Sequence, residues 1–540
     1  MKLLVIGLDG ASLRFLHPFL EAGTLPNLAD LMARGRWGTL RSTVPPATAP
    51  AWVSCFSGVN PGRHGIFNFV RPVGLGRLSA CTSADVQVPR LWHMLGHLGW
   101  TVHVVDVPLT SPPEQVTGVM VADLMTAGVR RAHTWPPTLA RELERRVGAR
   151  FRWAIADGLE VSRAYLKHLA RSVGDKLRLD CYLLEQYPAD ALVTVYQHLD
   201  VLCHYFWHVL DPAHPAFHPR LARRLTPSVE AVLTRLDGAL GRLVTLAGSD
   251  ALVVIVSDHG FGPARSRIHV NDLLVRWGML RLNDSARLVL EARRLGLRPA
   301  RLASLAARLD VVGIRRMTSL RAARKAMGVL DHLGMALDGR GTAAWFPHGL
   351  SPGIVVYENG PHREAFVERL VSRLRNLRGP DRGGPCFEVV ARREEVYRGP
   401  WVDRAPHIVL QPAEGYVLTA EIAGGGGFEA PLPGQVTGYH RPEGVYVFAG
   451  PSVEQTGRGG DASIQDVVPT LLAAFGAERV AVVDGACVSG VAVPGGAVGP
   501  GGRSVGLVDR RGGGGQEEVV LSQPGDTAEV VERLEALGYI

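Results

Sequence analysis

Short apolar runs recur along the chain, and segments with the apolar spacing of helices separate them. The runs are KLLVIG, TVHVVDV, ALVTVY, ALVVIVS, GIVVY, APHIVLQ and GVYVFAG. Strands that are buried on both faces are continuously apolar, whereas strands with one solvated face alternate apolar and polar residues. The pattern therefore predicts an α/β fold with a doubly wound, mostly parallel sheet and helices on both of its faces.

The pattern divides the chain into four parts. Residues 1–275 and 346–485 carry the apolar runs and are expected to form the first and second parts of one core. Residues 276–345 are rich in arginine and leucine, which predicts a basic helical insertion or cap. This insertion either packs on the core with a solvated outer face or covers an anionic substrate or a membrane surface. In residues 486–540, a Gly-rich tether precedes a predicted C-terminal helix with one apolar stripe.

Charge and composition narrow the class of partner. The formal net charge of +8 favours anionic ligands such as a phosphorylated small-molecule substrate or lipid headgroups. The arginines are not interleaved with aromatic residues, so no specific nucleic-acid binding is expected. The sequence has no apolar run of membrane-spanning length, and MKLLVIGLDG reaches Asp9 too soon for the apolar region of a secretory leader, so no leader is expected and peripheral membrane contact stays open. Six cysteines without a CxxC pair favour a reducing, cytoplasmic location.

Acidic and histidine residues follow two of the predicted strands. Asp9 comes after KLLVIG, and Asp258 with His259 comes after ALVVIV. A single aspartate after a strand commonly caps a turn or a helix, but ligand crevices in open α/β sheets also form at this carboxyl edge. Carboxylate oxygens and imidazole nitrogens together suit zinc or manganese. The sequence therefore predicts one metal-ligand set of Asp9, Asp258 and His259.

A predicted helix and a loop supply a second ligand set. Asp200 and His204 are four residues apart in QHLDVLCHYFWHVLD, a spacing that places both side chains on one helix face. His198 and His208 are rival candidates in the same segment. His440 lies in TGYHRPEG, just before another apolar run. With His440 added to the preferred pair, two divalent ions would be close enough to clamp one phosphoryl group.

Thr48 is the candidate nucleophile. It lies in VPPATAPAW, where Pro46 and Pro50 restrict the backbone just before a segment with helical spacing. The hydroxyl would either cap the helix or, with its pKa lowered by a divalent cation, attack phosphorus. Both roles are compatible, because a helix start also offers N–H groups to phosphate oxygens.

These motifs, in this order, resemble the alkaline phosphatase superfamily. The resemblance is to the type I phosphodiesterase/nucleotide pyrophosphatase branch and its predicted phosphohydrolase/phosphomutase relatives. It rests on VIGLDGA, TVPPATAPAWVSCFSGVNPGRHGIFNF, HLDVLCHYFWHVLD, VIVSDHGFG and TGYHRPEGVYVFAGP, and it covers residues 1–125, 180–275 and 385–485. The resemblance implies an alkaline phosphatase-like fold and two divalent metal ions, usually Zn²⁺, with Mn²⁺ as the alternative.

The resemblance also implies roles for individual residues. Thr48 would be the covalent nucleophile and a further ligand of the ion held by the first set. Asn68 is the implied substrate-binding residue, although it lies one place earlier than the phosphoryl-binding asparagine of nucleotide-cleaving relatives. The implied function is a metal-dependent phosphoester hydrolase that acts on diesters or pyrophosphates. A phosphomutase with the same metal site and a non-catalytic binder of an anionic ligand or membrane surface are the alternatives.

Overall fold

The computed structural model describes residues 1–123, 133–148, 161–284, 286–287, 337–349, 351–380, 383–424, 426–430, 436–477 and 482–491. Most of the predicted basic insertion lies outside these residues, as do the predicted Gly-rich tether and C-terminal helix. No helix in the described ranges is long and apolar enough to cross a membrane.

The largest sheet is parallel through its centre. Its neighbouring strands β9, β1, β8, β5 and β6 all run in the same direction. β18 lies antiparallel between β9 and β2, and β7 lies antiparallel to β6 at the other edge. Within the described residues this sheet consists of β1 (Leu3–Leu8), β2 (Arg36–Arg41), β5 (Val102–Val105), β6 (Met120–Val121), β7 (Thr134–Trp135), β8 (Ala191–Tyr196), β9 (Leu252–Val256), β18 (Glu443–Ala449), β19 (Gly457–Arg458) and β20 (Ala462–Ser463).

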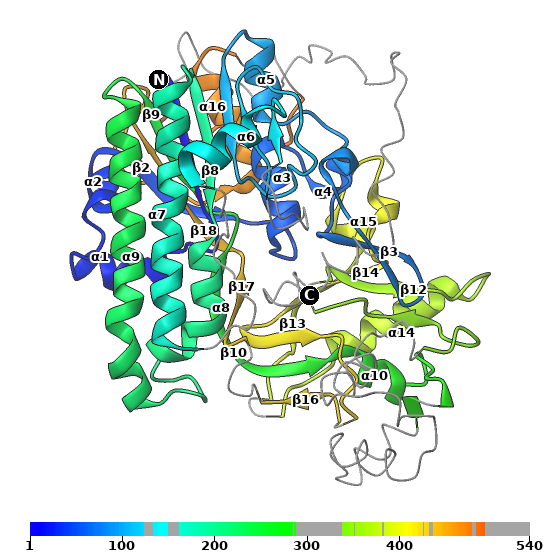
Figure 1. Cartoon of the computed structure of the whole chain (residues 1–540). Coiled ribbons are helices and arrows are strands. Elements are labelled where there is room, and N and C mark those ends of the chain that lie inside the picture. The colour runs from blue at the N-terminus through cyan, green and yellow to red at the C-terminus, as the bar shows by residue number, and fades with distance from the viewer. Residues whose placement is uncertain are drawn as a thin grey trace, which may run out of the picture.

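Helices cover both faces of this sheet (Figure 1). Along β1, Leu4 and Ile6 pack into one apolar cluster with α1, α2, α7, α8 and α9, whereas Leu3 and Val5 pack into another with α3, α5 and α16. Side chains alternate between the faces of a strand, so both faces of β1 are buried. This arrangement confirms the predicted doubly wound α/β fold. The helices concerned are α1 (Leu13–Glu21), α2 (Pro26–Arg34), α3 (Thr48–Ser57), α5 (Leu91–His97), α7 (Arg163–Gln186), α8 (His198–Leu210), α9 (Pro219–Ala247) and α16 (Val467–Ala474).

A second group of strands lies beside the main sheet and is called here the accessory unit, the described elements from β10 to β16 (Figure 1). The strand β10 pairs with β15 and β16 in this unit and with β17 on the way back to the main sheet. A separate sheet in the order β11–β12–β14–β13 shares an apolar cluster with α14. The elements are β10 (Gly260–His269), α10 (Val270–Arg276), β11 (Ala344–Trp345), β12 (Gly353–Val356), α14 (Arg363–Arg375), β13 (Phe387–Arg392), α15 (Arg393–Val396), β14 (Ile408–Pro412), β15 (Gly415–Thr419) and β16 (Phe428–Glu429), followed by β17 (Gly438–Arg441).

The accessory unit takes up part of the span that was expected to continue the core. The runs GIVVY and APHIVLQ form β12 and β14, which pair antiparallel with each other and not with the main sheet. A continuous apolar run indicates burial but does not identify the partner strand, which explains the difference. Among the described strands that follow β9, β18 is the first to pair in the main sheet.

Contacts from the core hold the accessory unit in place. The Tyr397 hydroxyl, just after α15, donates a hydrogen bond of 2.8 Å to the carbonyl oxygen of Val44. Leu75 and Leu78, from a hairpin of the core, pack against the apolar cluster of the accessory unit. Both contacts lie close in sequence to candidate site segments. The remaining short elements are α4 (Pro61–His64), the hairpin strands β3 (Val70–Gly74) and β4 (Arg77–Ala80), and α6 (Leu139–Leu143).

Candidate metal centre

The predicted ligands meet at the carboxyl edge of the main sheet. Asp9 directly follows β1, and Asp258 with His259 follows β9, the neighbour of β1. The helix α8 begins two residues after β8 ends, and it brings two further ligands to the same edge. The last ligand arrives on β17, which pairs with the first residues of β10. All six predicted ligand side chains are fully buried.

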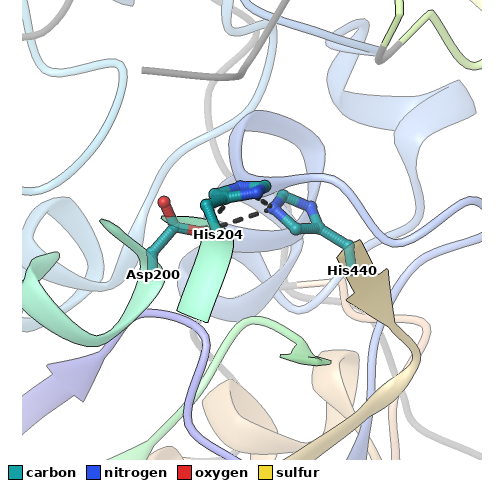
Figure 2. A group of neighbouring side chains, drawn as sticks. All are labelled: Asp200, His204 and His440. Atoms are coloured by element: carbon teal, nitrogen blue, oxygen red, sulfur yellow. Dashed lines mark hydrogen bonds and ion pairs between the residues drawn. The ribbon is translucent and has the colours of Figure 1, made fainter. Parts of the chain in front are cut away.

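Asp200, His204 and His440 form one compact group (Figure 2). The Oδ1 atom of Asp200 lies 3.4 Å from Nε2 of His204 and 3.3 Å from Nε2 of His440. The two Nε2 atoms are 2.9 Å apart. One ligand atom from each residue lies within 4.8 Å of the others, so the three can hold one ion. The helical spacing predicted for Asp200 and His204 is therefore present, and His440 joins them from β17.

The hydrogen bonds of the imidazole rings orient their lone pairs. In each of the three candidate histidines, His204, His440 and His259, Nδ1 faces a backbone carbonyl oxygen. A carbonyl only accepts, so Nδ1 carries the proton and Nε2 is left as a lone-pair donor that faces the cluster. The carbonyls belong to Gly438, Pro46 and Gly260, at 3.1, 3.3 and 3.2 Å respectively.

The second predicted set converges on His259. Its Nε2 atom lies 3.1 Å from the hydroxyl oxygen of Thr48, 3.2 Å from Oδ2 of Asp258 and 3.6 Å from Oδ1 of Asp9. Oδ1 of Asp200 is 3.9 Å from the same nitrogen, and Asp9, Asp200 and His259 form a second group with ion-binding geometry. Asp200 therefore lies between the two ligand sets, a position that its place in the sequence did not indicate.

The electrostatics of the cluster fit a divalent cation. Burial raises the pKa of Asp9 well above its usual value, and the negative charges of Asp258 and Asp200 add to this effect. Burial, together with Asp200, also raises the pKa of Asp258. Burial opposes ionisation of Asp200 too, but His204 and the neighbouring histidine outweigh it and lower the pKa of Asp200. Burial and His440 lower the pKa of His259, which keeps its ring neutral.

Oδ1 of Asp9 and Oδ2 of Asp258 are buried in the cluster without a hydrogen-bond donor. An uncompensated buried carboxylate is costly unless a cation or a donor satisfies it. The three carboxyl groups and three imidazoles of the cluster supply the oxygen and nitrogen donors that Zn²⁺ and Mn²⁺ take in proteins. The residues present therefore fit a pair of divalent ions.

Thr48 is the first residue of α3 and not its N-cap, so the expectation that its hydroxyl caps the helix is wrong. Ala47 has extended backbone angles and its carbonyl accepts the first helical bond, from the Ala51 amide at 3.0 Å. Pro50 lies in the first turn, where its missing N–H costs no helical bond. No side chain caps this end of α3, and the hydroxyl of Thr48 faces His259 instead.

The structure also shows functional contacts that the sequence reading missed. The indole N–H of Trp52 donates a hydrogen bond of 3.0 Å to Oδ2 of Asp9. Phe261 packs its ring edge-on against His204 and His440, with centroids 4.8 and 5.0 Å away. The sequence did contain a signal for both contacts, because each aromatic residue lies within four positions of a candidate site residue. Trp52 lies one helical turn after Thr48, and Phe261 lies two residues after His259.

The remaining candidates lie elsewhere. His198 is buried and its pKa falls to about 3 through burial and nearby Lys176. Nδ1 of His208 contacts the hydroxyl of Thr437 at 3.1 Å. Neither histidine belongs to the two ligand groups found among the described residues. Asn68 is buried after α4, and its side-chain oxygen accepts a hydrogen bond of 2.6 Å from the following amide. Its substrate-binding role stays a prediction.

Comparisons with known proteins identify the family of the chain and structures with a similar fold. Residues 3–440 match the family model of type I phosphodiesterase/nucleotide pyrophosphatase, a span that contains all six candidate ligands. In fold, the chain is similar to phosphonoacetate hydrolase from Sinorhizobium meliloti 1021 in complex with phosphonoformate, with 16% identity and a TM-score of 0.51 over 83% of this chain and 90% of that one. A murine ectonucleotide pyrophosphatase/phosphodiesterase 5 has 12% identity and a TM-score of 0.48, over 87% of this chain and 94% of that one. A comparison with curated proteins gives no match.

Proposed function

Since the chain belongs to the type I phosphodiesterase/nucleotide pyrophosphatase family, we propose that it is a two-metal phosphoester hydrolase with Thr48 as its nucleophile. One observation carries the proposal. The Thr48 hydroxyl lies 3.1 Å from Nε2 of His259, inside a buried cluster of carboxylate and imidazole donors. A hydroxyl placed there without a capping role is positioned for nucleophilic chemistry.

The two ions would be held by separate sets of side chains. When bound, they supply the Lewis acidity that favours the Thr48 alkoxide and neutralises charge on the phosphoryl oxygens. The mixture of oxygen and nitrogen donors favours Zn²⁺, with Mn²⁺ as the alternative. We assign one ion to Asp9, Thr48, Asp258 and His259, and the other to Asp200, His204 and His440.

The reaction consists of two in-line displacements. Oγ1 of Thr48 forms a bond to phosphorus while the bond to the leaving oxygen breaks, and the leaving group departs with the electron pair and takes up the proton that Thr48 loses. Water then attacks phosphorus, the bond to Oγ1 breaks, and one proton of that water returns to Thr48. The uncapped start of α3 would offer its backbone N–H groups and its positive dipole end to phosphoryl oxygens, and Asn68 is the proposed second donor.

The proposed substrates are phosphodiesters or pyrophosphates of small molecules. The formal net charge of +8 favours such anions over neutral substrates. A phosphomutase would use the same residues in the first displacement but would return the phosphoryl group to the substrate. Product analysis separates these outcomes, because hydrolysis alone incorporates oxygen from water into the phosphoryl product.

The test is an assay of Zn²⁺-reconstituted protein on an aryl phosphodiester, an aryl phosphate monoester and a nucleotide. We expect the diester or the nucleotide to be cleaved fastest and a chelator to abolish turnover. Thr48→Ala should lower kcat by at least about a thousandfold, whereas Thr48→Ser, which keeps the hydroxyl, should retain most of it. Undiminished turnover in Thr48→Ala would refute the covalent mechanism, and chelator-resistant turnover would refute the metal site.

A further inference from the structure

We propose that Trp52 is a positioning residue for the metal ligand Asp9, an inference that rests on the proposed two-metal function. The indole Nε1 of Trp52 lies 3.0 Å from Oδ2 of Asp9, and both side chains are fully buried. A carboxylate with one oxygen held by a donor keeps a fixed orientation. The other oxygen, Oδ1, then faces Nε2 of His259 at 3.6 Å and accepts no hydrogen bond.

The hydrogen bond from Trp52 gives the two carboxylate oxygens of Asp9 different roles. Oδ2 of Asp9 is used by Trp52, so Oδ1 is the atom that remains for a cation. The indole N–H only donates, so it cannot itself bind a cation in place of the carboxylate. Buried partners of this kind orient metal ligands, and their removal typically weakens metal binding by about 10- to 100-fold.

The packing around Trp52 links it to the nucleophile as well. Trp52 lies one helical turn after Thr48 on α3, and its ring stacks on Phe56 with centroids 5.5 Å apart. The ring also lies against β1. A Cβ atom on Gly7 would be 2.5 Å from Cη2 of Trp52, so a glycine is needed there. One side chain thus connects the helix that presents Thr48 with the strand that Asp9 follows.

This geometry predicts an effect on one ion and not on the other. Trp52 contacts Asp9, which belongs to the set with His259 and Thr48. In the group of Asp200, His204 and His440, the two imidazole rings are oriented by different contacts, with backbone carbonyls. Loss of the indole N–H should therefore weaken the first ion while the second stays bound. A purely structural role of the ring would weaken both ions or neither.

The experiment is a Zn²⁺ titration of chelator-stripped protein with a chromophoric competitor, together with metal content after gel filtration. We compare Trp52→Phe with Trp92→Phe. Trp92 is an equally buried tryptophan, 1% exposed, whose indole N–H donates to Glu114 at 3.1 Å, so it controls for loss of a buried indole. We expect Trp52→Phe to bind one of the two ions about 10- to 100-fold more weakly, and Trp92→Phe to bind both normally.

The outcomes separate this inference from the proposed function. Two tightly bound ions in Trp52→Phe would overturn the positioning role, as would equal weakening of both. A wild-type protein that binds no Zn²⁺ would overturn the proposed function itself. Should Trp52→Phe not fold, Trp52→Tyr is the second variant. In wild type, the indole ¹⁵N–H resonance that Trp52→Tyr lacks should shift during the Zn²⁺ titration, and a resonance that does not move would count against the inference.

Discussion

Removal of the divalent ions should lower the thermal stability of the protein by a measurable amount. The proposed ligands come from segments as far apart as Asp9 and His440, so the unfolded chain has no preformed site. An ion that binds only the folded state stabilises it by mass action. Removal also leaves Asp9, Asp200 and Asp258 buried together without a cation.

The size of this effect follows from the number of sites. At a free concentration of about 100 times Kd, each ion contributes about 2.7 kcal/mol, or about 5 kcal/mol for two. An unfolding entropy of about 2.1 cal/mol/K per residue implies that, over 540 residues, 1 kcal/mol moves the midpoint by about 1 °C. Chelation should therefore lower the midpoint of the wild-type protein by about 5 °C.

Differential scanning calorimetry of Zn²⁺-loaded and chelator-stripped protein measures this shift. His204→Ala should reduce it to about half, because one of the two ions is lost. His208→Ala is the matched control, since His208 lies one turn further along α8 and contacts Thr437 instead. It should keep the full shift. A wild-type midpoint that chelation leaves unchanged, or an equal loss in both variants, would refute the reasoning.

Three further predictions concern the surroundings of the site. Gly7→Ala should destabilise the fold by about 1–3 kcal/mol in urea unfolding, because the new methyl group would meet Trp52 at 2.5 Å; an unchanged urea midpoint would argue against this packing. Tyr397→Phe removes the hydrogen bond to Val44, so the free energy of unfolding should fall by about 1 kcal/mol. It should also lower kcat while the Zn²⁺ content is maintained, and unaltered stability and kcat would contradict this prediction. Burial lowers the pKa of His198 to about 3, so this group takes up its proton in the unfolded chain first and stability should fall as pH drops from about 6.5 toward 3. In metal-free protein, His198→Phe should lessen the change of the free energy of unfolding with pH by about 1.4 kcal/mol per pH unit. The measurement is urea unfolding of wild type and variant at pH 5 and pH 7, and an equal change between the two pH values in both proteins would disprove the assignment.

The fold was largely predictable because burial leaves a direct trace in the sequence. Four continuous apolar runs became the adjacent parallel strands β9, β1, β8 and β5. The apolar runs of β12 and β14 did not predict their sheet correctly, because a buried strand has the same continuous apolar sequence in either sheet. Pairing partners depend on contacts between distant segments, which apolar patterning does not encode.

The candidate site was predictable where local geometry decides it. The four-residue spacing of Asp200 and His204 survives on α8, and both strand-end motifs reach the same edge of the sheet. The place of Asp200 between the two sets and the bond from Trp52 to Asp9 depend on how α8 and α3 lie against the strands. The N-cap was misplaced because Ala47, which has no side-chain acceptor, takes the capping backbone geometry.

The stereochemical course at phosphorus tests the central claim most directly. An in-line displacement inverts the configuration at phosphorus, so attack by Thr48 followed by attack by water gives net retention. The measurement is hydrolysis of a chiral phosphorothioate diester in ¹⁸O-labelled water by the Zn²⁺-loaded protein, with analysis of the product configuration. We predict retention. Inversion would show that water attacks the substrate directly and would contradict the role of Thr48 as nucleophile.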